Sequence, residues 1–207
     1  MFGIRLQTAG MLAGVLLLTS CSQAPQASPK GEPAGEKSSA AAGPVSGKTA
    51  FWEMYKSAHA WATDLAPLAL ESKTFPGAKN EAGKSEMWSA TFGSPRKHEA
   101  RTFIYSVAGH AQDVSKGVTV GRALAWGGPT REALPFETAD FVIDSDAAYQ
   151  AAFAQGTAWL KKHPDKEVSL ALGNASRFDG PVWYVQWGDK KSGYAAYVSA
   201  KSGTVVK

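Results

Sequence analysis

One pattern, a helix followed by short strands, occurs twice between residues 51 and 207 and constrains the fold more than any other feature of the chain. In the first copy, apolar residues keep helical spacing over residues 51–66, with Thr49 as the expected N-cap and Pro67 as the end. In the second copy, Asp144-Ser145-Asp146 opens a helical pattern that Pro164 stops. Such a chain is expected to fold as two versions of one small unit.

The strand candidates that follow the two helices also correspond in order. Three pairs of segments match: 68–70 with 170–172, 88–93 with 183–188 (Trp-x3-aromatic-Gly in both), and 101–107 with 194–200. The predicted fold class is α+β, with related units over residues 51–138 and 139–207. Each unit is one helix packed on a small antiparallel sheet. Units of this size bury modest cores, so we expect the two to pack together.

The second copy resembles the PepSY domain of exported bacterial proteins. Three segments carry the resemblance: 144–149 (DSDAAY), 181–185 (PVWYV) and 197–206 (YVSAKSGTVV). Ser199 stands where the family commonly has an acid, and Lys201-Ser202-Gly203 replaces its Thr-Gly. The first copy resembles the family only loosely. The resemblance implies a noncatalytic module of the cell envelope that binds or restrains peptidases.

The N-terminus predicts export and a lipid anchor. Residues 1–20 read as a signal peptide, with a basic start and ten apolar residues over 9–18, too few to span a membrane. Leu18-Thr19-Ser20-Cys21 resembles the lipobox of bacterial lipoproteins, which implies a diacylglyceryl group on Cys21 and cleavage after Ser20. An ordinary secretory signal beside an unrelated cysteine is the alternative. We expect the protein to meet the membrane through the lipid on Cys21, within the cell envelope. Ser22 favours the outer membrane, facing the periplasm, if the bacterium has two membranes.

A tether is expected between the anchor and the folded region. Residues 21–50 contain the lipidated cysteine and a stretch dominated by Pro, Ala, Ser and Gly, without an aromatic residue. Such a segment buries too little apolar surface to offset chain entropy, so we expect it to be disordered and dispensable for folding. All aromatic residues except Phe2 lie in residues 51–207. That density implies a well-filled core, a ring-lined surface, or both.

The aromatic residues of the last strands are the candidates for a binding face, namely Trp187, Tyr184 and Tyr197. Alternate side chains of a strand share a face, so Trp183 and Trp187 lie on one face of the sheet and Tyr184 on the other. We assign the tryptophan face to the core, with Trp183 packed on the helical stripe of Tyr149, Phe153 and Leu160, and Trp88 in the equivalent place of the first copy. A ligand or peptide groove is the alternative, and an exposed edge strand could add a partner peptide.

Catalytic and cofactor sites are not indicated. Ser94-x-x-Lys97 fits an S-x-x-K nucleophile pattern and Lys191-Ser192-Gly193 its companion, but Gly93 and Pro95 indicate a turn. The histidines lack metal-ligand spacing, Asp144-Ser145-Asp146 fits a helix cap better than a cation site, and no glycine-rich cofactor loop is present. A net charge of +4 does not indicate a nucleic-acid partner. We therefore expect no enzyme activity, metal or cofactor.

The function predicted from the sequence is that of a membrane-anchored envelope lipoprotein acting as a noncatalytic binding module, with a peptide or a peptidase as the suggested partner. The alternative is a carrier that holds a small molecule or a peptidoglycan fragment in a pocket between the two units. A carrier needs a concave pocket with convergent polar groups, whereas a protein-binding module needs an exposed edge or a flat patch.

Overall fold

A computed structural model describes residues 43–75, 80–109 and 114–207, so the signal peptide, Cys21 and most of the predicted tether lie outside the described residues. The helices are α1 (Gly47–Trp61), α2 (Ser145–Leu160) and the short 3-10 helix η1 (Thr138–Asp140). The strands are β1 (Val45–Ser46), β2 (Ala66–Ser72), β3 (Asn80–Glu81), β4 (Lys84–Ser85), β5 (Met87–Ser94), β6 (Glu99–Ser106), β7 (Gly117–Val120), β8 (Leu124–Ala125), β9 (Val168–Gly173), β10 (Val182–Trp187), β11 (Tyr194–Ser199) and β12 (Val205–Val206). The fold is α+β, as the sequence predicts.

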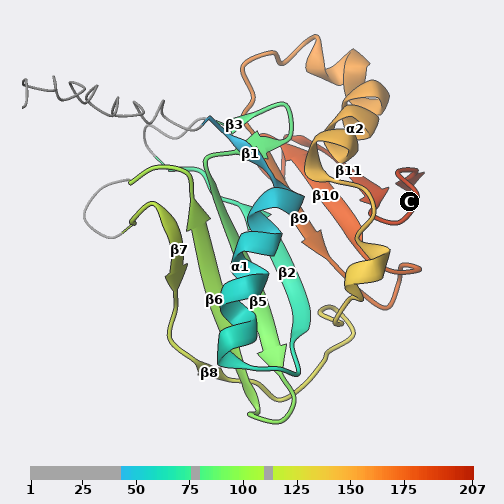
Figure 1. Cartoon of the computed structure of the whole chain (residues 1–207). Helices are drawn as coiled ribbons and strands as arrows, with labels where there is room; N and C mark the ends of the chain where they lie inside the picture. The colour runs from blue at the N-terminus through green and yellow to red at the C-terminus, as the bar shows by residue number, and fades with distance from the viewer. Residues whose placement is uncertain (1–42, 76–79, 110–113) are drawn as a thin grey trace, which may run out of the picture. The chain divides into compact units, whose positions relative to one another are not determined.

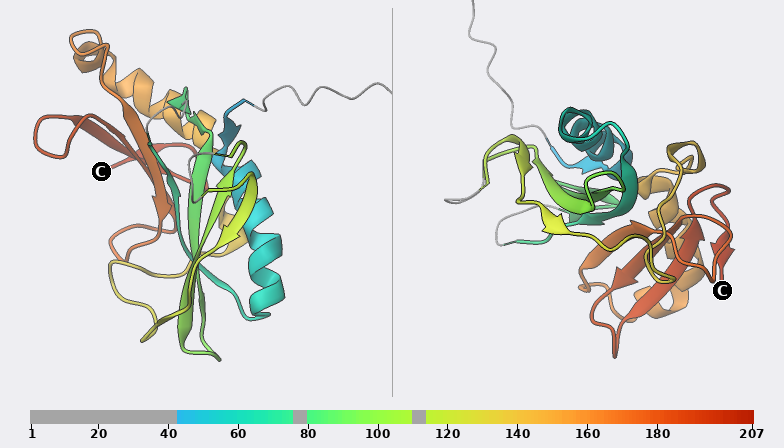
Figure 2. Two further views of the ribbon diagram at one scale, coloured as in Figure 1. Left: turned by 90° about the vertical axis from the view of Figure 1, so that its left-hand side faces the viewer. Right: turned by 90° about the horizontal axis from the view of Figure 1, so that it is seen from below.

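One antiparallel sheet runs through both predicted units (Figure 1). Its order is β12-β11-β10-β9-β2-β5-β6-β7, with β8 also paired to β6. β2 and β9 join the two halves, with Leu70 opposite Leu172. The sheet is therefore continuous across the border predicted at residues 138 and 139. The views in Figure 2 show that it twists strongly between the green and the red strands, as antiparallel strands of L-residues do.

The two long hairpins share one register. In β5–β6, Trp88 lies opposite Tyr105, and Phe92 lies opposite Arg101. In β10–β11, Trp183 lies opposite Val198, and Trp187 lies opposite Tyr194. The correspondence read from the sequence, 88–93 with 183–188 and 101–107 with 194–200, thus matches the pairing of the strands residue by residue.

Both long helices cover the same face of the sheet. α1 packs against β2, β5 and β6, and α2 packs against β10 and β11. The largest buried side chains between these layers include Trp88, Trp183, Phe51, Phe92 and Phe103. They belong to one continuous core that extends under both helices. Within residues 43–75, 80–109 and 114–207, no long helix covers the other face, which we call the helix-free face.

Part of the predicted tether has regular secondary structure. The predicted tether ends at residue 50, but Val45–Ser46 form β1 and α1 starts at Gly47, so the tether assignment is wrong for residues 45–50. The N-cap of α1 is Ser46, whose hydroxyl accepts the N–H of Thr49 at 3.4 Å, not Thr49 itself. These residues fold because Gly47 and Ala50 are buried against the core.

The N-termini of the two helices meet, and side chains at the start of α2 cap the start of α1. The N–H of Gly47 donates to the Ser145 hydroxyl at 2.7 Å, and the N–H of Lys48 donates to the Asp144 carboxylate at 2.8 Å. Asp144 is also the N-cap of its own helix, where it accepts the N–H of Ser145. Free N–H groups at the start of a helix must find acceptors, and α1 finds two of them in the second half of the chain.

The two buried tryptophans pack at this junction. Trp183 contacts Trp88 at 6.2 Å between ring centroids and Phe141 at 5.8 Å. The tryptophan whose ring lies against Tyr149 is Trp187, at 5.5 Å, and not Trp183 as predicted. The Trp88 indole donates to the Val45 carbonyl at 3.0 Å, and the Trp183 indole to the Ile143 carbonyl at 2.9 Å. Each acceptor stands two residues before its helix, so the indole rings are held at the helix starts.

Candidate functional site

The predicted aromatic face divides between the two sides of the sheet. Tyr184 and Tyr197 lie opposite each other on β10 and β11, on the side without helices, with ring centroids 5.0 Å apart. Trp187 is 3% exposed and lies on the helix side, with its ring 5.5 Å from that of Tyr149. The prediction that Trp187 joins the two tyrosines is wrong, because alternation along β10 turns it into the core.

The tyrosine pair borders a hollow of about 330 Å³ on the helix-free face. Its floor comes from both halves of the chain, with Ala69 and Glu71 on β2, Ala171 and Gly173 on β9, and Val182 and Tyr184 on β10. Burial, and secondarily the adjacent Tyr197, raise the pKa of the Tyr184 phenol. Tyr184 therefore offers a neutral hydroxyl beside an apolar ring surface at neutral pH.

Two connecting segments form the wall of this hollow. The Leu134 N–H donates to the Asn174 carbonyl at 2.9 Å, and the Ser176 N–H donates to the Arg131 carbonyl at 2.8 Å. The Asn174 side chain also donates to the Pro135 carbonyl at 2.8 Å. These bonds hold the segment after β9 against the segment before η1.

Arg177 is fixed over the same hollow by aromatic rings. Its guanidinium carbon lies 4.6 Å from the ring centroid of Phe178 and 4.9 Å from that of Tyr197. It also donates to the Tyr197 hydroxyl at 2.8 Å. Cation–π contacts of this kind orient the guanidinium plane. Arg177 and Phe178 were not predicted from the sequence, because they meet Tyr197 only when the loop between β9 and β10 folds back over the sheet.

A polar hollow of about 540 Å³ adjoins the aromatic one and is lined by Arg131, Glu132, Ala175, Ser176 and Arg177. Glu132, Ala175 and Arg177 line both hollows, so the two are neighbours. Together they place an aromatic surface beside a group of charged side chains. This combination suits the binding of a ligand that has both an apolar and a charged part.

A different groove lies along α2, about 560 Å³ in volume, and Trp187 contributes to it. Phe153 is 39% exposed at this groove, and Lys161, His163 and Lys166 also line it. Phe153 was expected in the core beneath α2, but its ring stacks on Tyr149 near the surface. Glu81 and Glu167 oppose the lysines in the same groove, so it does not present one sign of charge.

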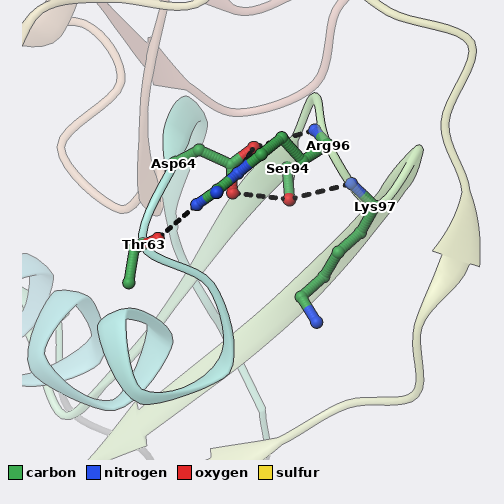
Figure 3. A network of polar contacts seen from close by, with 5 residues as sticks. All are labelled: Thr63, Asp64, Ser94, Arg96 and Lys97. Carbon is green, nitrogen blue, oxygen red and sulfur yellow. Dashed lines mark hydrogen bonds and ion pairs between the residues drawn. The ribbon is translucent and has the colours of Figure 1, made fainter.

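The S-x-x-K serine holds a turn together (Figure 3). The Ser94 hydroxyl donates to the Asp64 carboxylate at 2.8 Å, and the Arg96 N–H donates to the other oxygen at 2.8 Å. The Arg96 N–H, with help from Ser94, holds the pKa of the Asp64 carboxyl below its ordinary value. The Lys97 side chain points away from Ser94, so the pair is not arranged as nucleophile and base.

Ser192 of the Lys-Ser-Gly sequence has a similar place in the turn between β10 and β11. Its hydroxyl donates to the Asp189 carboxylate at 2.6 Å, and its N–H and that of Lys191 donate to the same group at 2.9 and 2.8 Å. These bonds, the serine hydroxyl first, lower the pKa of Asp189 to about 2. Asp189 thus stays ionised and closes the hairpin turn.

Within the described residues, no group of three or more His, Cys, Asp or Glu side chains is placed to hold a metal ion. Asp144 and Asp146, the acidic pair weighed for a cation, accept backbone N–H groups at the start of α2 instead. Among the same residues, no helix is both long and apolar enough to cross a membrane.

No protein-family model matches the chain, and no curated protein matches it significantly. Among solved structures, a candidate lipoprotein of Clostridium difficile 630 is similar, with a TM-score of 0.46 and 13% sequence identity. The match covers 80% of this chain and 91% of that protein.

Proposed function

We propose that this chain is a lipid-anchored lipoprotein of the cell envelope and that it binds a ligand, without catalysing a reaction, on the helix-free face of its sheet. The observation that supports this proposal most is the half-buried ring pair of Tyr184 and Tyr197 beside a hollow. Aromatic rings left outside the core, with fixed polar groups beside them, are typical of binding surfaces. We take a peptide as the ligand.

The lipid anchor is part of the proposal and rests on the sequence around Cys21. Each buried methylene of an acyl chain contributes about 0.8 kcal/mol, and two or more chains make release from a bilayer negligible. Cys21→Ala should therefore move the protein from the membrane pellet to the soluble fraction. Intact-mass analysis of the wild-type protein should show an acylated Cys21 as its first residue, and an unmodified cysteine would contradict the anchor. Ser22 supports placement at the outer membrane.

The PepSY-like organisation in two units is a further part of the proposal. Its support is the shared register of the two hairpins and the equivalent indole bonds of Trp88 and Trp183. The ring pair is confined to the second half, because Ser89 and Ile104 lie opposite each other at the corresponding place in the first half. A duplicated scaffold in which one copy carries the rings fits a binding module.

A second candidate, a carrier of a small molecule or of a peptidoglycan fragment, is favoured by one observation. The hollow under Tyr184 takes its floor from both halves of the chain, β2 on one side and β9 with β10 on the other. A pocket between the two units is what the carrier hypothesis requires. The two candidates share the same face and differ only in the ligand.

The ligand face is tested by calorimetric titration of residues 22–207 with peptide mixtures and, separately, with peptidoglycan digests. Tyr184→Ala and Tyr197→Ala should each weaken binding about tenfold or more, because stacking on the ring pair is lost. Ile104→Ala changes the corresponding place of the first half and should leave binding unchanged. Equal binding by all the variants would place the ligand elsewhere. Binding of the digest alone would favour the carrier.

A further inference from the structure

Arg177 holds a guanidinium in a fixed orientation with hydrogen-bonding capacity to spare. A guanidinium has five N–H donors, and the bond to Tyr197 uses one of them. No carboxylate among the described residues lies within ion-pair distance of Arg177. Its position is nevertheless restrained by Phe178 and Tyr197, so little side-chain entropy is lost when it binds a partner.

The surroundings of Arg177 define what the free donors can bind. It stands where the aromatic hollow meets the polar one, and Arg131 and Ser176 line the polar side. Of the two acids nearby, Glu71 is paired with Lys73 at 2.6 Å. Glu132 lines both hollows and is the acid left to face the two arginines.

These charges favour a monoanion that also carries N–H donors. The fork of an arginine matches the two oxygens of a carboxylate. Glu132 would repel a doubly charged phosphate more strongly than a carboxylate, and it can accept the N–H of an adjacent amide. A peptide that ends in a free carboxylate has both features within one residue.

We propose that Arg177 binds the C-terminal carboxylate of a peptide whose preceding side chains lie on Tyr184 and Tyr197. This inference rests on the proposed function, since it specifies the ligand of the same face. Arg131 supports the carboxylate from the polar hollow, and Glu132 accepts an amide N–H of the peptide backbone. The site thereby distinguishes the end of a peptide chain from its interior.

The test compares N-acetylated random tetrapeptide mixtures that end in a free acid or in an amide, titrated into residues 22–207. The acid mixture should bind about tenfold or more tightly than the amide mixture, since a charge-assisted bidentate bond is lost in the amide. Arg177→Gln should abolish that difference, and Arg177→Lys should restore part of it. Arg122→Gln removes the same charge at an exposed position outside both hollows and should leave the difference intact.

Each outcome separates this inference from the proposed function. Acid and amide binding equally, with both weakened by Tyr184→Ala, would overturn the carboxylate assignment and leave the ligand face in place. No binding of either mixture would overturn the peptide ligand itself. The acid–amide comparison uses the wild-type chain, so it stands even if an Arg177 variant folds poorly. Displacement of the acid mixture by inorganic phosphate at concentrations where acetate has no effect would also overturn the assignment.

Discussion

Trp88 and Trp183 hold equivalent positions in the two halves of the chain, and both lie in the core. Both are fully buried, both lie one strand away from the β2–β9 junction, and each donates its indole N–H to the backbone just before a helix. Gly47 fits between them because a Cβ at that position would lie 2.7 Å from the Trp183 ring and 3.2 Å from the Trp88 ring. The start of α1 is therefore shaped by the two indoles.

Truncating either tryptophan should destabilise the whole protein. Trp88→Ala and Trp183→Ala should each lower the free energy of unfolding by about 3–5 kcal/mol, through lost burial and an unpaired carbonyl. Trp52→Ala, at an indole that is 40% exposed on α1, is the matched control and should cost much less. Denaturant unfolding monitored by circular dichroism measures all three. Wild-type stability in both core variants would refute the core assignment.

The positions of some side chains could be predicted from the sequence, and those of others could not. Alternation along β10 correctly places Tyr184 and Trp183 on different faces of the sheet, since it depends only on the local period of a strand. The same rule places Trp187 on the face of Trp183, so the prediction that Trp187 belongs to the binding face with Tyr184 was wrong. Arg177 could not be found in this way, because its partners Phe178 and Tyr197 meet only when the loop folds back over the sheet.

At the level of elements, the first turn of α1 depends on the start of α2. α1 has its own N-cap in Ser46, but the N–H groups of Gly47 and Lys48 donate to the side chains of Ser145 and Asp144 in the other half of the chain. The Lys48 ammonium also reaches the Val142 carbonyl at 2.7 Å. The periodicity over residues 51–66 predicted a helix here but neither of its ends, since α1 runs from Gly47 to Trp61 and Ala66 and Pro67 belong to β2. The start could not be read locally, because two of its acceptors are almost a hundred residues away.

Removing the Ser145 hydroxyl should destabilise the start of α1 from the other half of the chain. Ser145→Ala leaves the buried Gly47 N–H without its acceptor, at a cost of about 1–3 kcal/mol. Asp146→Ala removes a carboxylate that accepts the Ala147 N–H of its own helix and should cost less. Hydrogen exchange of the first turn of α1 should accelerate in Ser145→Ala and not in Asp146→Ala. Unchanged exchange in both variants would contradict the capping of α1 by Ser145.

At the level of the whole molecule, one sheet and one core unite what the sequence presents as two units. The hairpins were predictable because each is a local pattern, and their shared register follows from the repeated Trp-x3-aromatic-Gly spacing. The pairing of β2 with β9 was not, since a pattern read along the chain does not say which strands become neighbours. The hollow beside Tyr184 depends on that pairing, so from the sequence a pocket between the two units could be stated only as an alternative hypothesis.

The true start of the folded region can be measured by truncation. A chain beginning at residue 43 should melt at the same temperature as one beginning at residue 22. A chain beginning at residue 51 loses the Ser46 cap and the Val45 carbonyl that binds Trp88, so its melting temperature should fall by about 10 °C or more. Equal melting of all three chains would show that residues 43–50 contribute nothing to the fold.

The central claim is that the ligand lies on the helix-free face, against Tyr184 and Tyr197. The most direct measurement is the set of nuclear Overhauser effects between a bound peptide or peptidoglycan fragment and the aromatic rings of isotope-labelled residues 22–207. The account predicts contacts to the rings of Tyr184, Tyr197 and Phe178, and none to Trp183, which is fully buried on the opposite face. Contacts confined to Phe153 and Tyr149 along α2 would contradict it.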